Sequence, residues 1–469
     1  MAAIRRAGWS LPVCDHSLVV NADRISAEVS SAPAPRIWSA RAAFETGLIA
    51  AGFVALFVLL PHNFSPDDKD RFSDISLLLD HGRLAAGPYS LVMPLASVPL
   101  LVLGDVIRSP AYWAVRFNVV VTAAGVLAAY RMVRARADPR LFRLVVLVLL
   151  FASFYLNRMR DYNAEVFTAT LVTLGIICLV TSRHQVAGWT AIVIGVVNTP
   201  AAIVGLVLMA VMQAVRTRRL RHLAAIAAAV ALIMLEAWIR RGSPLDTGYT
   251  DNHGFRTIMP YSGLPGFSYP FLLGLAGILF SFGRGLLFFT PGVFMLLNAR
   301  VRRQLPWPAA VAMMVLFTTG LILLYARWWA WYGGVAWGPR FFAFAAIPSS
   351  IVVAAGIWRA GESWKADALT LGVLGLSAWV GLAGAIADLK VDLAICQQAG
   401  YANEQLCWFT PDYSSLWQPV RQFPHLLPGE VVLVIFLCAV YAYLAAPLVA
   451  SLARAVPRLP RPWATDWSL

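Results

Sequence analysis

The chain has 469 residues, of which 59% are hydrophobic and 13% are charged, and its mean hydropathy is +0.68. This composition excludes an ordinary soluble globular protein, whose surface is far richer in charge. The net charge of +14 does not indicate nucleic-acid binding, because the Arg residues gather between apolar segments, as they do in cytoplasmic loops of membrane proteins. The apolar runs are roughly 17–27 residues long and lack strand alternation, and about 20 apolar residues cross a bilayer as a helix. The sequence therefore predicts an all-α polytopic membrane protein.

The N-terminal residues 1–40 are mixed in character, with Ser, Ala and Pro clustered at 30–35. They predict a disordered cytoplasmic tail, and they lack the long apolar core of a cleaved signal peptide. A first span at 44–61 begins inside, because Arg36 and Arg41 precede it. The acidic stretch at 63–74 should then emerge on the external face. Residues 41–453 form the predicted transmembrane domain, and 454–469 a second cytoplasmic tail.

The next apolar run, 89–107, contains Pro94 and Pro99. The Arg cluster that follows the span at 112–133 should be cytoplasmic, so only one span can separate it from the external acids. We therefore expect residues 89–107 to be a re-entrant or interfacial element within a large external first loop, 62–111. Further external loops are predicted at 240–270, 327–340 and 389–429.

The later spans are predicted at 141–157, 164–182, 187–213, 222–239, 271–297, 308–326, 341–358, 368–388 and 430–452. The run at 187–213 is interrupted at Asn198 and Pro200 and lies between two basic groups, which predicts two half-length helices that meet within the membrane. The total is about 10–12 transmembrane helices, with both termini in the cytoplasm. Arg240 and Arg241 are the main exception to the cytoplasmic placement of basic clusters.

The external acids are the first candidate site. Five Asp residues fall between 67 and 80, in a chain with 24 Asp and Glu in total. Asp67 and Asp68 follow the first span by a few residues, where a carboxylate can act as a general base or hold a divalent ion such as Mg²⁺ or Mn²⁺. The alternative is a solvated loop in which Lys69, Arg71 and Arg83 balance the acids. Asp67 and Asp68 are favoured over Asp70 and Asp74, and the choice between the first two stays open.

A second acidic position opens the span at 164. Asp161 and Glu165 are four residues apart and can face the same way on a helix. The alternative is that they pair with Arg158 or Arg160 at a helix start. Asp67, Asp68 and Glu165 are the candidate ligands of a divalent ion.

Three arginines are candidates for binding a phosphate. Arg284 lies inside an apolar run between Gly283 and Gly285, where a charge is costly and usually faces a polar cavity or an ionic partner. Arg327 and Arg340 flank a turn rich in aromatic residues and Gly, and Arg binds phosphate with a bidentate fork. The alternatives are a structural ion pair for Arg284 and an interfacial aromatic belt for the turn.

Other external polar and aromatic residues are candidates for binding the sugar or the acceptor: Trp331, Tyr332, Asp246 and His253. Aromatic rings stack on sugars, although a lone His is more often a surface residue. Cys396 and Cys407 lie in one predicted external loop without the spacing of a metal site, so they are candidates for a disulfide.

The order of these motifs resembles that of bacterial membrane glycosyltransferases of the GT-C superfamily. The resemblance rests on external acids after the first span, Gly-Pro-Tyr-Ser-Leu-Val-Met-Pro-Leu at 87–95, an acid opening a later span, Gly-Ser-Pro-Leu-Asp-Thr-Gly-Tyr at 242–249, Ser-Phe-Gly-Arg-Gly-Leu at 281–286, and the Trp-rich run ending in Trp-Gly-Pro-Arg at 337–340. It covers residues 44–360 and points to the family 39-like group that includes protein mannosyltransferases and aminoarabinose transferases. Asp67 or Asp68 would match the family's first-loop acid, and Asp161 or Glu165 its second.

The resemblance implies an inverting transfer of a sugar from a polyprenyl-phosphate donor to a glycan, lipid or protein of the cell envelope, on the outer face of the inner membrane. The partners expected are therefore the lipid-linked donor, the acceptor and membrane lipids, with no nucleic acid. Two alternatives stay open. A lipid-linked sugar flippase or transporter would spread polar residues through the membrane midplane. A polysaccharide polymerase or ligase would depend on external Arg and His.

Overall fold

The computed structural model describes residues 39–455, with gaps at 182–183, 250–255, 265, 335, 388–393, 395, 418–419 and 421–422. The predicted tails therefore lie almost wholly outside the described residues, and His253 lies outside them too. The chain divides into two compact units, Met1–Phe44 and Glu45–Leu469. In the described residues every regular element is a helix, and one isolated β-bridge joins Asn63 to Asp161. The all-α class is confirmed.

The described residues contain eight helical segments long and apolar enough to cross a membrane. They are α2 (Ala40–Val58), α9 (Ala164–Thr181), η2 with α11 (Pro200–Ala202 and Ile203–Thr217), η3 with α12 (Leu220–Leu223 and Ala224–Arg241), α17 (Pro308–Tyr325), η5 with α18 (Arg340–Ala345 and Ala346–Trp358), α19 (Trp364–Ile386) and α24 (Pro428–Ala455). Four shorter apolar helices accompany them: α4 (Val92–Val106), α6 (Phe117–Val133), α10 (Gln185–Asn198) and α13 (Phe271–Phe280). The protein is a multi-pass membrane protein.

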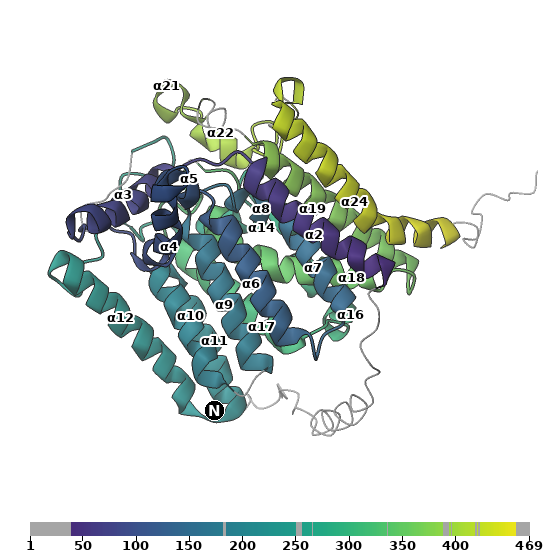
Figure 1. The fold of residues 1–469 in the computed structure, drawn as a ribbon, viewed down its shortest axis with the longest axis horizontal. Coiled ribbons are helices and arrows are strands. Elements are labelled where there is room, and N and C mark those ends of the chain that lie inside the picture. The colour runs from purple at the N-terminus through teal and green to yellow at the C-terminus, as the bar shows by residue number, and fades with distance from the viewer. Residues whose placement is uncertain are drawn as a thin grey trace, which may run out of the picture. The chain divides into compact units, whose positions relative to one another are not determined.

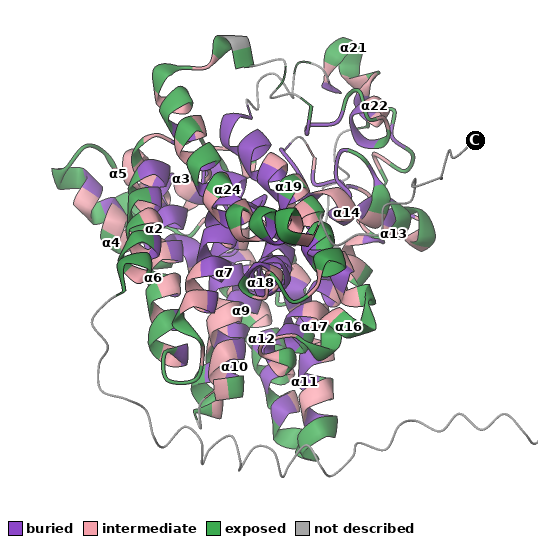
Figure 2. Ribbon diagram, turned by 90° about the vertical axis from the view of Figure 1, so that its right-hand side faces the viewer, coloured by how far each residue is buried: buried purple, intermediate pink, exposed green. Residues whose placement is uncertain are grey.

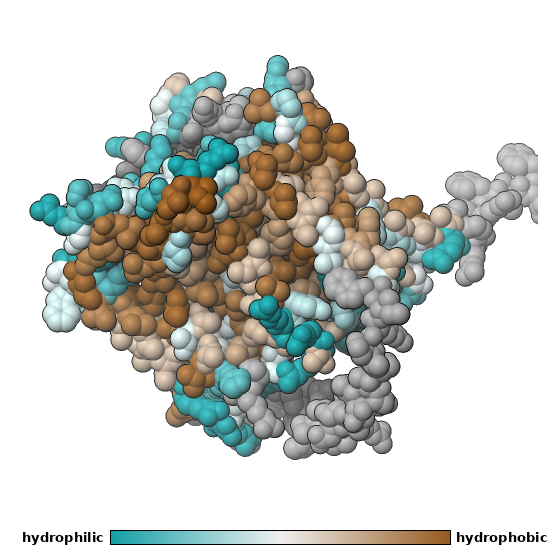
Figure 3. Space-filling model, viewed as in Figure 1, coloured by the Kyte–Doolittle hydropathy of each residue, from teal (hydrophilic) through white to brown (hydrophobic). Residues whose placement is uncertain are grey.

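The core of the larger unit lies along α18 and α9. The η5–α18 segment is 83% buried and packs on α7 (Pro139–Phe151), whereas α12 is only 22% buried. In Figure 2 the ribbon around α18 and α7 is largely purple, the colour of buried residues. In Figure 3 apolar side chains gather across the middle of the visible face, and hydrophilic ones gather above and below. Such an apolar band is what a bilayer's hydrocarbon would cover.

The predicted break at Asn198 is present, but its position differs from the prediction. The Asn198 amide donates to the Ala164 carbonyl at 3.1 Å and to Thr168 Oγ1 at 3.0 Å, so the break lies beside the first turn of α9. Helix α10 therefore runs back along α9, with which it packs, and α11 returns beside α17 (Figure 1). The chain therefore reverses at one end of the bundle, whereas the sequence predicted two half-length helices that meet within the membrane.

The predicted span at 271–297 is wrong as a continuous helix. Helix α13 ends at Phe280, and only short helices follow: α14 (Leu286–Phe289), α15 (Pro291–Phe294), η4 (Met295–Leu297) and α16 (Ala299–Arg303). The Gly283 amide donates to the Trp408 carbonyl at 3.1 Å, and a Cβ on Gly283 would lie 2.0 Å from the Cys407 carbonyl oxygen. The chain turns at 281–285 because another backbone occupies the space that a helix would need. Arg284 therefore lies in a loop.

The predicted first loop contains helices, as expected. They are α3 (Pro66–His81), α4 and α5 (Pro110–Ala114), and Figure 1 places all three at the end of the bundle where α12 terminates. Helix α3 begins at Pro66 because Ser65 and Asp68 form a reciprocal capping box and Pro is favourable at the first helical position. It ends where Gly82 adopts φ 64°. The acidic stretch is thus the first turn of a helix, which fixes the direction of each carboxylate.

Candidate active site

A pocket lies where the first loop meets the segment before α9. Its charged lining residues are Asp68, Arg71, Arg158, Arg160, Asp161, Glu165 and Arg340. The other lining residues are Asn63, Ser65, Asn157, Asn163, Ala336, Trp337 and Ala387. Three acids and four arginines thus line one pocket, which places groups that can accept a proton beside groups that can bind an anion.

The walls of the pocket are joined by backbone contacts between distant parts of the sequence. The Asn63 amide donates to the Arg160 carbonyl at 3.2 Å, within the isolated bridge to Asp161. Arg160 donates back to the Pro61 carbonyl at 3.0 Å and to the Ala387 carbonyl after α19. The first acidic position is thereby held next to the second.

Asp68 is almost completely buried, with 1% of its surface exposed. Its Oδ2 accepts from Ser65 Oγ at 2.6 Å and from the Ser65 amide at 3.1 Å, and its Oδ1 lies 3.3 Å from Arg71 Nη1. Burial first, and then the neighbouring Asp161 and Glu165 carboxylates, raise the pKa of Asp68 to about 7, although Arg71 and Ser65 oppose this shift. Asp68 therefore changes protonation state near neutral pH, as a general base should.

Asp67 has the opposite environment, although it is the adjacent residue. Its Oδ2 lies 2.8 Å from Arg340 Nη1, and the Tyr89 hydroxyl donates to the same carboxyl group. Burial alone would raise the pKa of Asp67, but Arg340 and Arg71 outweigh burial and hold the pKa below its usual value. Asp67 is therefore ionised at neutral pH, and it fixes the direction of Arg340.

The two acids of the second acidic position also have different surroundings. Asp161 precedes α9 and pairs with Arg158, whose Nη2 lies 3.2 Å from Asp161 Oδ2, so the pairing predicted as the alternative is present. Burial raises the pKa of Asp161, and Arg158 and Arg160 oppose the rise. Glu165 lies in the first turn of α9, and its carboxylate forms no hydrogen bond or ion pair with any residue that the structure describes. Glu165 is thus the pocket carboxylate available to a ligand.

The candidate ligands of a divalent ion do not converge. Asp67 turns to Arg340 and Asp68 turns to Arg71. Across the described ranges, no three His, Cys, Asp or Glu side chains are placed to hold a metal ion. The set Asp67, Asp68 and Glu165 therefore does not fit Mg²⁺ or Mn²⁺, and no step below is assigned to a metal.

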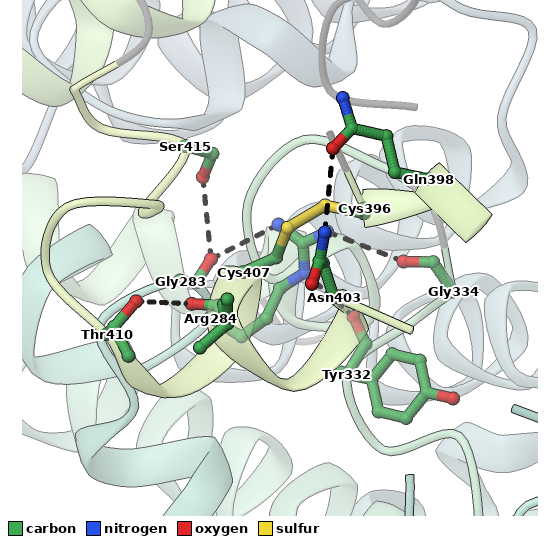
Figure 4. Close-up of a disulfide and its surroundings, with 11 residues drawn as sticks. Gly283, Arg284, Tyr332, Gly334, Cys396, Gln398, Asn403, Cys407, Thr410 and Ser415 are labelled. Carbon is green, nitrogen blue, oxygen red and sulfur yellow. Dashed lines mark hydrogen bonds between the residues drawn. A yellow bond between two sulfur atoms is a disulfide. The ribbon is translucent and has the colours of Figure 1, made fainter. Parts of the chain in front are cut away.

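Arg284 and Tyr332 lie beside a disulfide (Figure 4), and the Trp331 ring lies 5.7 Å from the Tyr332 ring, centroid to centroid. Cys396 and Cys407 are bonded, with their Cα atoms 6.1 Å apart. Arg284 Nε donates to the Tyr332 carbonyl at 2.9 Å, and its guanidinium lies 4.1 Å from the centroid of the Trp408 ring, on which Tyr332 stacks. Trp331 and Tyr332 are 1% and 3% exposed. None of the three lines the pocket, so their contacts give them a part in holding the disulfide loop.

The segment that follows the disulfide supports the pocket. Trp337, which lines the pocket, donates from Nε1 to the Ser415 carbonyl at 3.3 Å, and Ser414 Oγ donates to the Phe282 carbonyl at 2.7 Å. We expect Cys396→Ser to lower stability by about 3 kcal/mol, because a disulfide that closes a short loop contributes about that much. The melting temperature in detergent checks this, with Cys438→Ser, an exposed free thiol, as the control. A melting temperature equal to that of the wild type would contradict it.

The remaining predicted residues lie apart from the pocket or outside the description. Arg327 is exposed and donates to the Phe267 carbonyl at 3.3 Å. Asp246 Oδ1 accepts from the Gly248 amide at 2.8 Å, within the loop that brings Tyr249 to within 6.4 Å of Tyr89, ring to ring. His253 is not among the described residues. Of the three predicted phosphate-binding arginines, Arg340 lines the pocket and the other two do not.

Tyr89 and Trp337 were not among the candidate residues from the sequence. Arg71 and Arg158 were named there only as charges that balance the acids, and the structure pairs Arg71 with Asp68 and Arg158 with Asp161, each at a spacing of three residues. Tyr89 and Trp337 lie in the two stretches 87–95 and 337–340 that were noted for their Gly and Pro. No spacing in the sequence indicates that Tyr89 reaches Asp67.

Comparison with known proteins gives a likeness of structure. No family model matches the chain, and no curated protein matches it in sequence. The structure is similar to the crystal structure of ArnT from Cupriavidus metallidurans in the apo state, with 16% identity, a TM-score of 0.48, and coverage of 88% of this chain and 76% of ArnT. The ArnT structure bound to undecaprenyl phosphate gives the same identity and TM-score over 89% and 80% of the two chains.

Proposed function

We propose that the protein is an inverting glycosyltransferase that moves a sugar from a polyprenyl-phosphate donor to a cell-envelope acceptor on the extracytoplasmic face of the inner membrane. The observation that carries the proposal is the pairing, in one pocket, of a carboxyl group whose pKa lies near neutrality with arginines that can bind an anion. The pocket lies beside the ends of apolar helices, where a lipid-linked substrate can present its headgroup. The order of motifs in the sequence points to the same chemistry.

In the proposed reaction, the Asp68 carboxylate accepts the proton of the acceptor hydroxyl. The acceptor oxygen forms a bond to the anomeric carbon, and the bond from that carbon to the phosphate oxygen breaks, which releases polyprenyl phosphate. The displacement inverts the anomeric centre. The leaving phosphate gains charge as the bond breaks, and a guanidinium already aimed at it stabilises that charge.

Arg340 is the residue that we assign to the donor phosphate. Its Nε is buried and has no hydrogen-bond partner among the described residues, while its Nη1 is held by Asp67. Arg158 likewise has a buried Nε without such a partner. An unsatisfied buried donor is costly, so both groups favour an anionic ligand. Glu165, with its free carboxylate, is assigned to the acceptor.

The extracytoplasmic orientation is supported by two features of the chain. A disulfide forms in an oxidising compartment, and Ser415, in the segment that follows Cys407, accepts a hydrogen bond from Trp337 in the wall of the pocket. Arg216, Arg218, Arg219 and Arg221 follow α11, at the end of that helix away from its start beside the pocket. The lipid flippase and the polymerase or ligase are the alternatives. Burial of the acids at a single pocket favours the transferase over the flippase.

The test is a transfer assay with purified protein in proteoliposomes and a panel of radiolabelled polyprenyl-phosphate sugars. We expect the wild type to release polyprenyl phosphate and to attach the label to an added envelope extract. Asp70→Asn is the matched control, because Asp70 is an exposed acid of the same helix. Movement of intact labelled lipid across the bilayer, with no release of sugar, would support the flippase instead.

A further inference from the structure

The two arginines that break the charge pattern, Arg240 and Arg241, close the last turn of α12. The Arg240 side chain is 2% exposed, although α12 as a whole is among the least buried spans. An arginine that is this buried at the end of an exposed helix must have its donors satisfied by nearby groups. Its partners all lie in one stretch of the first loop or on its own helix.

Arg240 joins both sides of the connection between α3 and α4. Its Nη2 lies 2.9 Å from Asp74 Oδ2 in α3, and its Nε donates to the Ala85 carbonyl at 2.8 Å. Its Nη1 donates to the Tyr89 carbonyl and lies 3.2 Å from Glu236 Oε1, one turn back on α12. The Arg240 guanidinium thus joins Asp74 of α3, and the backbone at Ala85 and Tyr89, to α12.

The neighbouring residues of α12 extend this attachment toward α4. Glu236 accepts from Ser90 Oγ at 2.9 Å and from the Leu91 amide at 2.8 Å, where α4 begins. The connection is also tightly packed, because a Cβ on Gly87 would lie 2.7 Å from Asp74 Oδ2. Residues 85–91 therefore have little freedom while Arg240 is in place.

Tyr89 is the link from this attachment to the pocket. Its carbonyl is held by Arg240, its hydroxyl donates to the Asp67 carboxyl group, and the Arg71 guanidinium lies 4.2 Å from the centroid of its ring. Asp67 in turn aims Arg340, and Arg71 contacts Asp68. A shift of the Tyr89 backbone would move both the phosphate-binding arginine and the base.

We infer that Arg240 is a positioning residue of the active site, which acts through Tyr89 to set the geometry of Asp67, Arg71 and Arg340. The expected effect of Arg240 on the transfer rate rests on the proposed function, whereas its expected effect on structure rests on the contacts alone. It also gives a reason for the buried Arg240 at the end of α12, which is an exception to the cytoplasmic placement of basic clusters. Arg240 contacts no reacting atom, so its role is separate from catalysis.

The test combines a double-variant cycle with hydrogen exchange. Arg240→Lys keeps the charge but cannot bind Asp74 and two carbonyls at once, so we expect it to fold and to lower the transfer rate by about 10-fold. Tyr89→Phe removes only the bond to Asp67 and should have a similar effect. If Arg240 acts through Tyr89, the double variant should be no slower than the slower single variant. Effects that multiply, or an Arg240→Lys rate within twofold of the wild type, would overturn the inference.

The matched control is Arg241→Lys, because Arg241 donates to the Gly87 and Asp246 carbonyls at 3.0 and 2.6 Å and not to Tyr89 or Asp74. We expect its rate to stay within twofold of the wild type. Hydrogen exchange of the amides in residues 85–91 gives a readout that needs no activity. It should be faster in Arg240→Lys, and unchanged exchange would overturn the inference. A wild-type protein that transfers no sugar would refute the proposed function, and exchange would then still decide whether Arg240 fixes this segment.

Discussion

Asp68→Asn is expected to lower the rate of sugar transfer by about 100-fold or more, because positioned general bases contribute about 10²–10⁴-fold. Asn has nearly the same shape and can still accept from Ser65, so the start of α3 should persist. What it loses is the ability to take a proton from the acceptor. The rate is measured with the lipid-linked donor in excess, beside Asp70→Asn, which should retain the wild-type rate.

The pH dependence of the wild-type rate distinguishes Asp68 from Asp67. A base must be ionised, so activity that depends on Asp68 should fall below a pKa of about 7 and drop tenfold for each further pH unit. The pKa of Asp67 is lowered, so a reaction that used Asp67 would already be at its maximum in mildly acidic solution. A rate that stays flat between pH 7 and pH 5, together with an active Asp68→Asn variant, would reassign the base to Asp67.

Arg340→Gln is the second large effect. We expect it to lower the transfer rate by about 100-fold, because removing one preorganised donor to a developing charge costs about 10²–10³-fold. Asp67, which lies 2.8 Å from Arg340, loses its ion-pair partner in this variant, so the pKa of Asp67 should rise toward its usual value. Arg340→Lys should recover part of the loss, because it restores the charge without the fork.

The comparison variant for Arg340 is Arg327→Gln, in the same aromatic turn. Arg327 is exposed and its recorded hydrogen bond goes to the Phe267 carbonyl, so we expect little change in rate. Binding of polyprenyl phosphate, measured by its protection of the wild-type protein against thermal unfolding, should weaken in Arg340→Gln and not in Arg327→Gln. Equal losses of polyprenyl phosphate binding in both variants would show that the phosphate does not bind to Arg340 in particular.

The sequence predicted the parts of the site that depend on position along the chain. It put the acids at 67–68 just after one apolar span and those at 161–165 at the start of another, and the structure brings both positions into one pocket. The structure adds the directions of the side chains, which the order of residues does not give. Asp67 and Asp68 point about 100° apart on a helix, so one meets Arg340 and the other Arg71. Their opposite pKa shifts arise from this difference in direction.

The misplacement of Arg284 has a physical cause. The run from Phe271 to Leu297 is apolar enough to predict one helix, and its glycines alone did not indicate an end. The helix ends because the backbone of Cys407 and Trp408, more than 100 residues later, occupies the space beside Gly283. Long-range contacts of this kind leave no local pattern. The segment around Cys407 also holds Trp331 and Tyr332 outside the pocket, because their rings pack on Phe409 and Trp408. Their aromatic rings had made them candidates for binding the sugar.

The most direct measurement is the stoichiometry of a single turnover by purified protein in proteoliposomes whose pocket faces outward. Radiolabelled polyprenyl-phosphate sugar is added outside with the acceptor, and the released polyprenyl phosphate is compared with the sugar attached. We expect one polyprenyl phosphate for each sugar transferred by the wild type, and formation of both products about 100-fold more slowly, or slower still, by Asp68→Asn. Transfer by Asp68→Asn at the wild-type rate, or labelled lipid that crosses the bilayer intact, would contradict an external active site built on Asp68 and Arg340.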